Sequence, residues 1–202
     1  MKRVMVLLCV VMLGISWQVV AGQSPQALVE ETSQLMLKKL KEEKEVISSQ
    51  PERIYELVNQ IVIPHFDFEY MSQLVLAKYW RTATPEQRRT FTEEFKQLLV
   101  RTYATSLNQY TDQELTYLPY REGSDKDQAL VRTEVEQPGG FPIPIDYRLH
   151  KNSDDWKVFD VVIDGVSLVT NYRTSFAKEI RQGDLDALIK TLTERNQEMM
   201  AK

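Results

Sequence analysis

The sequence predicts an α+β fold with four N-terminal helices, a strongly curved four-stranded antiparallel sheet and two C-terminal helices. Two observations support this prediction. Apolar residues recur at helical spacing through residue 110 and again from residue 167 onward. Between residues 114 and 164 they instead alternate at every second position, which is the period of a β-strand. Helices and strands therefore occupy separate parts of the chain, as they do in α+β proteins.

The first 22 residues are predicted to be a secretory signal peptide rather than part of the fold. Two basic residues precede an uncharged apolar run over Val4–Val20, and the small pair Ala21-Gly22 follows. The alternative is an uncleaved membrane anchor. A run of 17 residues is at the lower limit for a membrane span, however, and no basic cluster follows it. We therefore expect cleavage after Ala21 or Gly22, which leaves a single domain over residues 23–202.

Three helices are expected before the best-marked one. The first covers Pro25–Ser48, with apolar residues on one face and lysines and glutamates on the other. The second begins at Pro51, because proline is favoured in the first turn of a helix, and it ends at Pro64. The third follows a cap at Asp67 and ends at residue 79 or 80.

The fourth helix has the clearest start. Thr84 as the cap, Pro85 at the first position and Gln87 at the third form a capping box. The apolar stripe keeps helical period over several turns, at Phe91, Phe95, Leu98, Leu99, Tyr103, Leu107 and Tyr110. We expect a helix with so long and aromatic a stripe to pack on the sheet.

Four strands are expected, beginning near Leu115, Ala129, Ile143 and Trp156. Turn-forming residues at 138–140 and 152–154 join the later strands, so the sheet is predicted to be an antiparallel meander. The last strand is apolar on both faces from Val158 to Ile163, and we expect both faces to be covered.

Two helices complete the chain after a turn at residues 164–165. Ser167 is expected to cap the first of them, which Gly183 ends. Asp184 is expected to cap the second. The chain after Asn196 is expected to fray, as chain ends often do.

Composition excludes several classes of function. The net charge of -4 is too acidic for a general phosphate-backbone binder, so no nucleic-acid partner is expected. One cysteine and two histidines cannot supply the roughly four ligands of a structural zinc site. The cysteine, Cys9, lies in the predicted signal peptide, so the mature chain has no disulfide and must rest on its core. The bacterial periplasm is the compartment that fits best.

Groups able to catalyse a reaction are few. The chain has no dinucleotide-binding, phosphate-loop or zinc-protease motif, so neither a catalytic residue nor a metal site is predicted. His65 and His150 are interpreted as residues at the ends of elements. Asp160 could act as an acid or base in a cavity, or equally form a structural ion pair.

Two motifs are more specific. They are W-R-x-A-T-P-E-Q-R at Trp80–Arg88 and D-G-V-S-L-V-x-N-Y-R at Asp164–Arg173. In this order and behind a signal peptide, they resemble the MlaC family of periplasmic phospholipid-binding proteins, also known as toluene-tolerance auxiliary proteins. The similarity extends over about Leu28–Leu192, nearly the whole mature chain. One departure is Ala77, where the family usually has glycine, and we expect it only to tighten the third helix slightly.

The resemblance implies a lipid shuttle. The helices and curved sheet would enclose an apolar cavity that holds the acyl tails of a phospholipid, which is transported ligand and not a cofactor. The family passes lipid between an outer-membrane lipoprotein–porin complex and an inner-membrane ABC transporter with an MCE-domain subunit, and so maintains outer-membrane lipid asymmetry. We accordingly expect a monomer, no cofactor and no enzymatic activity.

Inward-facing alternation, rather than motif matching, predicts which residues would line such a cavity. The expected tail contacts are Leu99, Tyr103, Val131, Ile145, Tyr147, Val161, Ile163, Val169, Tyr172 and Phe176. Arg148, Lys151 and Arg173 are candidates to bind the phosphate of the head group, and Arg173 falls within the second motif. The alternatives are ordinary core packing for the first set, and solvated surface for Arg148 and Lys151.

Two other functions stay open. An open groove would favour a scaffold or chaperone that binds helices of a partner. A carboxylate with a raised pKa at the floor of a cavity would favour an enzyme of the nuclear-transport-factor-2 type, with Asp160 or His150 as the base.

Overall fold

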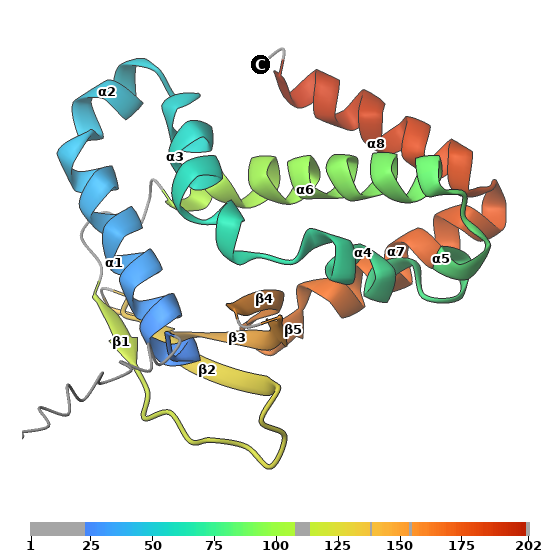
Figure 1. Ribbon diagram of the computed structural model, residues 1–202. Helices are drawn as coiled ribbons and strands as arrows, with labels where there is room; N and C mark the ends of the chain where they lie inside the picture. The colour runs from blue at the N-terminus through green and yellow to red at the C-terminus, as the bar shows by residue number, and fades with distance from the viewer. Residues whose placement is uncertain (1–22, 108–113, 138, 154, 201–202) are drawn as a thin grey trace, which may run out of the picture.

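The computed structural model describes residues 23–107, 114–137, 139–153 and 155–200. These ranges contain eight α-helices, one short 3₁₀ helix and a five-stranded antiparallel sheet of order β1-β2-β3-β4-β5 (Figure 1). The helices are α1 Pro25–Glu42, α2 Lys44–Ser49, α3 Arg53–Ile61, η1 Ile63–His65, α4 Phe68–Leu76, α5 Lys78–Thr82, α6 Pro85–Leu107, α7 Leu168–Gln182 and α8 Leu185–Met200. The strands are β1 Leu115–Tyr117, β2 Gln128–Val135, β3 Ile143–Asn152, β4 Asp155–Ile163 and β5 Val166–Ser167. The α+β class is confirmed, while the predicted signal peptide and Tyr110 lie outside the described residues.

The N-terminal helices are more divided than predicted. The expected helix over Pro25–Ser48 is interrupted at Glu43, whose φ of -106° and ψ of 18° leave the helical range. The Glu43 carboxylate instead accepts a hydrogen bond from Arg53 Nε at 2.7 Å. This ion pair fastens the break between α1 and α2 to the start of α3.

The third predicted helix is interrupted at Ala77. Its φ of 49° and ψ of -113° are values that glycine adopts readily and residues with a Cβ adopt rarely. As a result α4 ends at Leu76 and α5 starts at Lys78. The expectation that alanine only tightens a continuous helix is therefore wrong, because the position is a helix break that suits glycine.

The long helix α6 packs on other helices rather than on the sheet. Its capping box is confirmed, since Gln87 N donates to Thr84 Oγ1 at 3.1 Å and Thr84 N donates to Gln87 Oε1 at 2.9 Å. Figure 1 shows α6 between α8 on one side and α4 and α7 on the other. The predicted packing of its stripe on the sheet is wrong for Phe91 and Phe95, which other helices cover, and among the described stripe residues only Tyr103, near the end of α6, packs against the sheet core.

The sheet is the predicted meander with one strand more. The additional strand β5 has two residues, too few for a period of two to reveal it. The register between β3 and β4 shifts between Arg148 and Leu149, which is a bulge of the kind that bends a sheet. Asp160 and Val161 point to opposite faces of β4 and are both buried, so both faces of this strand are covered as expected.

The segment before α4 covers part of the free edge of β4. Phe66 forms a parallel bridge with Val158, and Asp67 N donates to Val158 O at 2.9 Å. At the end of β4, Val162 and Ile163 pair with the two residues of β5. A covered edge offers fewer free backbone groups to other chains.

The C-terminal helices begin at the predicted caps. Ser167 and Asp184 accept hydrogen bonds from backbone N–H groups in the first turns of α7 and α8. Helix α8 continues to Met200, so the expectation that the chain frays after Asn196 is wrong. Asn196 is buried, and its Nδ2 donates to the backbone oxygen of Glu94 on α6 at 3.0 Å.

The apolar side chains form three cores. The helical core lies among α4 to α8 and contains Phe91 and Phe176. The sheet core combines one face of β2, β3 and β4 with Leu28 of α1. The N-terminal core combines Leu40 of α1 with α3 and with Val100 of α6. Helix α1 therefore belongs to two cores at once.

Candidate functional site

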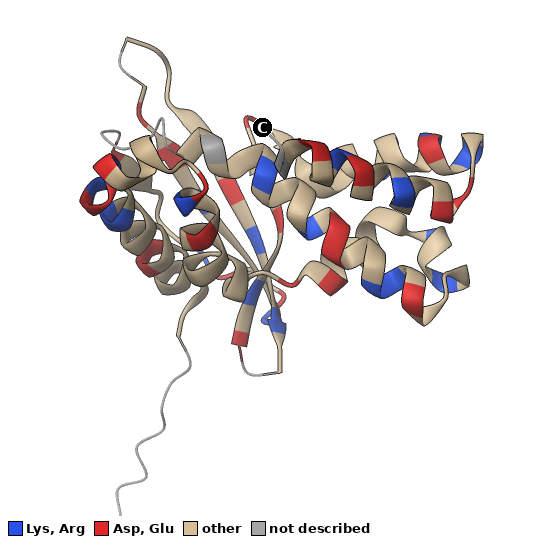
Figure 2. Ribbon diagram, turned by 90° about the horizontal axis from the view of Figure 1, so that it is seen from above, with Lys and Arg blue, Asp and Glu red and all other residues tan. Residues whose placement is uncertain are grey.

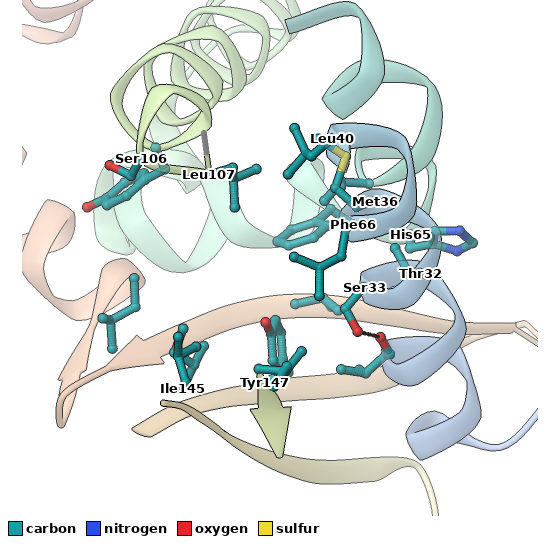
Figure 3. Close-up of a pocket in the computed structure, with 18 of the residues that line it drawn as sticks. Thr32, Ser33, Met36, Leu40, His65, Phe66, Ser106, Leu107, Ile145 and Tyr147 are labelled. Carbon is teal, nitrogen blue, oxygen red and sulfur yellow. Dashed lines mark hydrogen bonds between the residues drawn. The ribbon is translucent and has the colours of Figure 1, made fainter. Parts of the chain in front are cut away.

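A pocket of about 420 Å³ lies between α1 and one face of the sheet (Figure 3). Its other walls are residues around η1, the C-terminal end of α6 and β1. Leu28 at one end of α1 belongs to the sheet core and Leu40 at the other end belongs to the N-terminal core. The pocket therefore occupies the space that these two cores leave between them.

Helix α1 forms the longest wall. Its lining residues recur three and four positions apart, as one face of a helix does; they are Leu28, Val29, Thr32, Ser33, Met36, Leu37 and Leu40. Ser24 fixes the start of the helix, because its hydroxyl accepts a hydrogen bond from Ala27 N at 3.1 Å. The opposite, solvent-facing side of α1 carries the lysines and glutamates of the sequence pattern.

The sheet forms the opposite wall. Successive side chains of a strand point to opposite faces, so Ile143, Ile145 and Tyr147 of β3 share the pocket face. Figure 3 shows Ile145 and Tyr147 rising from the sheet, with Phe66 and Leu107 across the pocket from them. These walls are apolar except for a few hydroxyl groups, one histidine and one glutamate among the described lining residues.

Two titratable side chains of the pocket lining, Tyr147 and His65, are uncharged at neutral pH. Burial raises the pKa of the Tyr147 hydroxyl to about 12, so the phenol stays protonated. Burial lowers the pKa of His65, and the positive charge of Lys157 acts in the same direction. His65 is therefore neutral at neutral pH. The hydroxyl groups of Ser33 and Tyr117 are 2.6 Å apart and join α1 to β1.

The structure brings four of the ten predicted tail contacts to the pocket. They are Tyr103, Ile145, Tyr147 and Ile163. Val131 and Val161 lie in the sheet core beside it, whereas Leu99, Val169 and Phe176 lie in the helical core and Tyr172 packs against both. Contact of any of these residues with an acyl tail stays a prediction.

The sequence interpretation missed the contribution of α1 and η1. Met36, Leu40 and Phe66 line the pocket although none was predicted to do so. The signal was present, because the apolar stripe of the first helix was recognised. An apolar stripe of this kind also suits ordinary core packing, and nothing in its spacing separates the two roles.

The three predicted head-group residues are held elsewhere. Arg148 Nη1 donates to Asp160 Oδ2 at 3.1 Å, and Arg148 follows Tyr147 on the strand, so it points to the other face of the sheet. Arg173 Nε donates to Leu74 O at 2.7 Å and so joins α7 to the end of α4. Lys151 Nζ lies 5.4 Å from the centre of the Trp156 ring. Their contact with a phosphate stays a prediction.

Asp160 is a structural residue in this fold. It is only 2% exposed, and it accepts hydrogen bonds from Ser167 Oγ at 2.6 Å and from Val169 N at 3.1 Å, in addition to the bond from Arg148. A carboxylate at the first turn of a helix satisfies free N–H groups and complements the helix dipole. Asp160 therefore fastens the start of α7 to β4.

His150 also belongs to a packed network outside the pocket lining. Its Nε2 is 3.1 Å from Asp67 Oδ2, and its ring stacks on Tyr70 with centroids 4.5 Å apart. Asp67 in turn caps α4 by accepting from Tyr70 N at 2.9 Å. Within the described ranges, no group of three potential metal ligands occurs and no helix is both long and apolar enough to cross a membrane.

Comparisons with known proteins agree with one another. The family model described as MlaC protein matches residues 30–194. The toluene tolerance protein ttg2D of Pseudomonas putida is 34% identical over 173 residues, which cover 84% of this chain and 80% of that protein. The intermembrane phospholipid transport system binding protein MlaC of Haemophilus influenzae is 25% identical over 173 residues, covering 84% and 81%. A phospholipid-binding protein from Ralstonia solanacearum, solved in complex with a phospholipid, matches with a TM-score of 0.79 and 34% identity over 88% of this chain and 98% of that chain.

Proposed function

The chain belongs to the MlaC family, and from this membership and the pocket we propose that it is a phospholipid carrier of the bacterial periplasm. The observation that carries the proposal is the pocket between α1 and the sheet, whose walls are mostly apolar. The Ralstonia protein, which shares this fold, was solved with a phospholipid. We infer that the acyl tails of a phospholipid occupy the pocket of this chain.

The physical demand on such a carrier is to keep acyl tails from water. Two tails contain about 30 methylene groups at ~0.8 kcal/mol each, so exposing them costs on the order of 20 kcal/mol. A pocket for this purpose needs apolar walls and few charges. The α1 and β3 walls meet the first need. The pKa directions of Tyr147 and His65 keep these two side chains neutral at neutral pH, which leaves Glu114 as the one acidic residue of the described lining.

We propose that Tyr103, Ile145, Tyr147 and Ile163 contact the tails, together with the lining residues of α1. The other six predicted residues would act indirectly, since they fill the cores behind the pocket walls. No chemical step is needed for this function. The proposed carrier is therefore not an enzyme and needs no cofactor.

The proposed role is to move phospholipid between membranes and so support the lipid asymmetry of the outer membrane. Its partners would be an outer-membrane lipoprotein–porin complex and an inner-membrane ABC transporter with an MCE-domain subunit. A monomer suits this role, because a carrier must diffuse and present its pocket to each partner in turn.

Native mass spectrometry of the mature protein from periplasm tests the proposal. The expected result is an added mass equal to that of a diacyl phospholipid, lost on denaturation and identified after solvent extraction. A protein that is free of lipid as isolated, and that takes up none from phospholipid vesicles, would contradict the proposal. The apolar pocket would then favour a scaffold that binds a partner helix.

A further inference from the structure

One end of the sheet carries exposed apolar residues beside the pocket. Phe141, in the loop between β2 and β3, is 92% exposed, and Val166, after the turn between β4 and β5, is 55% exposed. Asp164 N donates to Pro144 O at 3.0 Å, which ties the turn after β4 to the start of β3. Residues 139–144 and 164–166 are called the sheet-end surface below.

The sheet-end surface is continuous with the pocket wall. Val135 and Ile143 pair with each other across β2 and β3 at the base of the first connection, and both line the pocket. Ile163, at the base of the second connection, also lines it and pairs with Val166. A molecule that covers Phe141 and Val166 therefore lies at one end of the pocket.

The charge around this surface has one sign. The segments 114–117, 134–146 and 162–167 meet at this end of the sheet, and they contain five acidic residues and no lysine or arginine. These are Glu114, Glu134, Glu136, Asp146 and Asp164. No ion pair in the described part of the chain involves any of them, although Arg132 faces Asp146 across the strands. On the helices, by contrast, both signs are interspersed (Figure 2).

We propose that the sheet-end surface is a docking site for another protein, which offers an apolar socket for Phe141 surrounded by lysine and arginine. An exposed aromatic side chain is the type of residue that anchors a protein interface. The five acidic residues at this end of the sheet supply the complementary charge and orient the encounter. The same residues disfavour a bilayer surface, because membranes attract basic segments and repel acidic ones. The docking site is a proposal separate from the carrier function. Only the idea that lipid passes through the docked end of the pocket rests on that function.

Site-specific photo-crosslinking in the native cells tests the docking site. Phe141 is replaced by p-benzoylphenylalanine, which remains aromatic, and the cross-linked peptides are identified by mass spectrometry. Val46 of α2, which is 43% exposed, receives the same residue as the control position. We expect position 141 to cross-link one protein other than this chain, through a segment that contains lysine or arginine, and position 46 not to do so.

Charge reversal supplies the matched comparison. Glu136→Lys, at the start of the loop that contains Phe141, should lower the cross-linking yield from position 141 by about tenfold. Glu122→Lys makes the same charge change in the exposed connection between β1 and β2, before β2 begins, and should leave the yield within about twofold. An equal effect of the two variants would overturn the charge argument.

Three other outcomes would overturn the proposal. A yield at position 141 no higher than at position 46 would show that nothing docks there, and a cross-link to a second copy would show self-association. The surface would be assigned to a bilayer if the protein floats with vesicles of phosphatidylethanolamine and phosphatidylglycerol and the Phe141→Ser variant does not. The amount of phospholipid that copurifies with the Phe141→Ser and Glu136→Lys variants reports the carrier function separately. We expect this amount to equal the amount that copurifies with the unsubstituted protein.

Discussion

Replacing Ala77 with glycine should stabilise the protein. Ala77 has φ 49° and ψ -113°, a conformation found at the first central position of turns that favour glycine. A residue with a Cβ held in such a region costs on the order of 1–3 kcal/mol. Glycine relieves this strain, but it also lowers the free energy of unfolding by about 0.4–1 kcal/mol, because it gives the unfolded chain more conformational freedom than alanine does. The net expectation for Ala77→Gly is a free energy of unfolding higher by about 1 kcal/mol.

Urea and thermal unfolding of the mature protein measure this difference. For a domain of this length, a gain of that size raises Tm by about 2–4 °C. Ala177→Gly is the matched control, because Ala177 lies inside α7, where glycine costs about 1 kcal/mol. The two substitutions should therefore change Tm in opposite directions. If both lower Tm equally, the helix break at Ala77 is not strained and the reasoning is refuted.

Three further predictions concern the pocket and its supports. Ile145→Asp puts a carboxylate in the pocket wall and should abolish copurified phospholipid in native mass spectra, whereas Leu130→Asp, on the exposed face of β2, should not; equal losses would contradict the proposed pocket. The raised pKa of Tyr147 adds stability that is complete below about pH 10 and is lost as pH rises toward about 12. The free energy of unfolding should therefore fall between about pH 9 and pH 11, and in Tyr147→Phe this fall should be smaller by about 1 kcal/mol. An unchanged fall would show that burial does not hold this phenol protonated. Asp160→Ala removes the acceptor for Ser167 and the start of α7 and should lower the free energy of unfolding by about 2–3 kcal/mol in urea, while a loss below about 0.5 kcal/mol would mean that this network is not structural.

Local chemistry explains why much of the fold was predictable. The capping box at Thr84 and Gln87 and the caps at Ser167 and Asp184 each need only a few adjacent residues, so the sequence contains the whole signal. The helix breaks are different. Glu43 leaves the helix where Arg53 of another helix pairs with it, and no spacing within the first helix reveals that partner.

The pocket was predicted only in part, because periodicity identifies a buried face and not what covers it. Leu99 and Leu40 both lie on apolar stripes and are both buried. Helices cover Leu99 in the helical core, whereas Leu40 faces the pocket as well as the N-terminal core. The difference depends on contacts between residues far apart in the chain, and hydrophobic patterning does not identify such contacts.

The two motifs that identify the family specify supports rather than pocket walls. In the first, Arg88 lies over the Trp80 ring at 5.2 Å and its Nε donates to Trp80 O at 2.9 Å, just before the cap of α6. In the second, Ser167 binds Asp160, and Arg173 joins α7 to α4. Such contacts need particular side chains, because caps and charged hydrogen bonds depend on geometry. A pocket wall needs only apolar side chains of suitable size, and these are interchangeable. A resemblance based on the motifs can therefore identify the family and its fold while giving little information about the residues that would contact lipid.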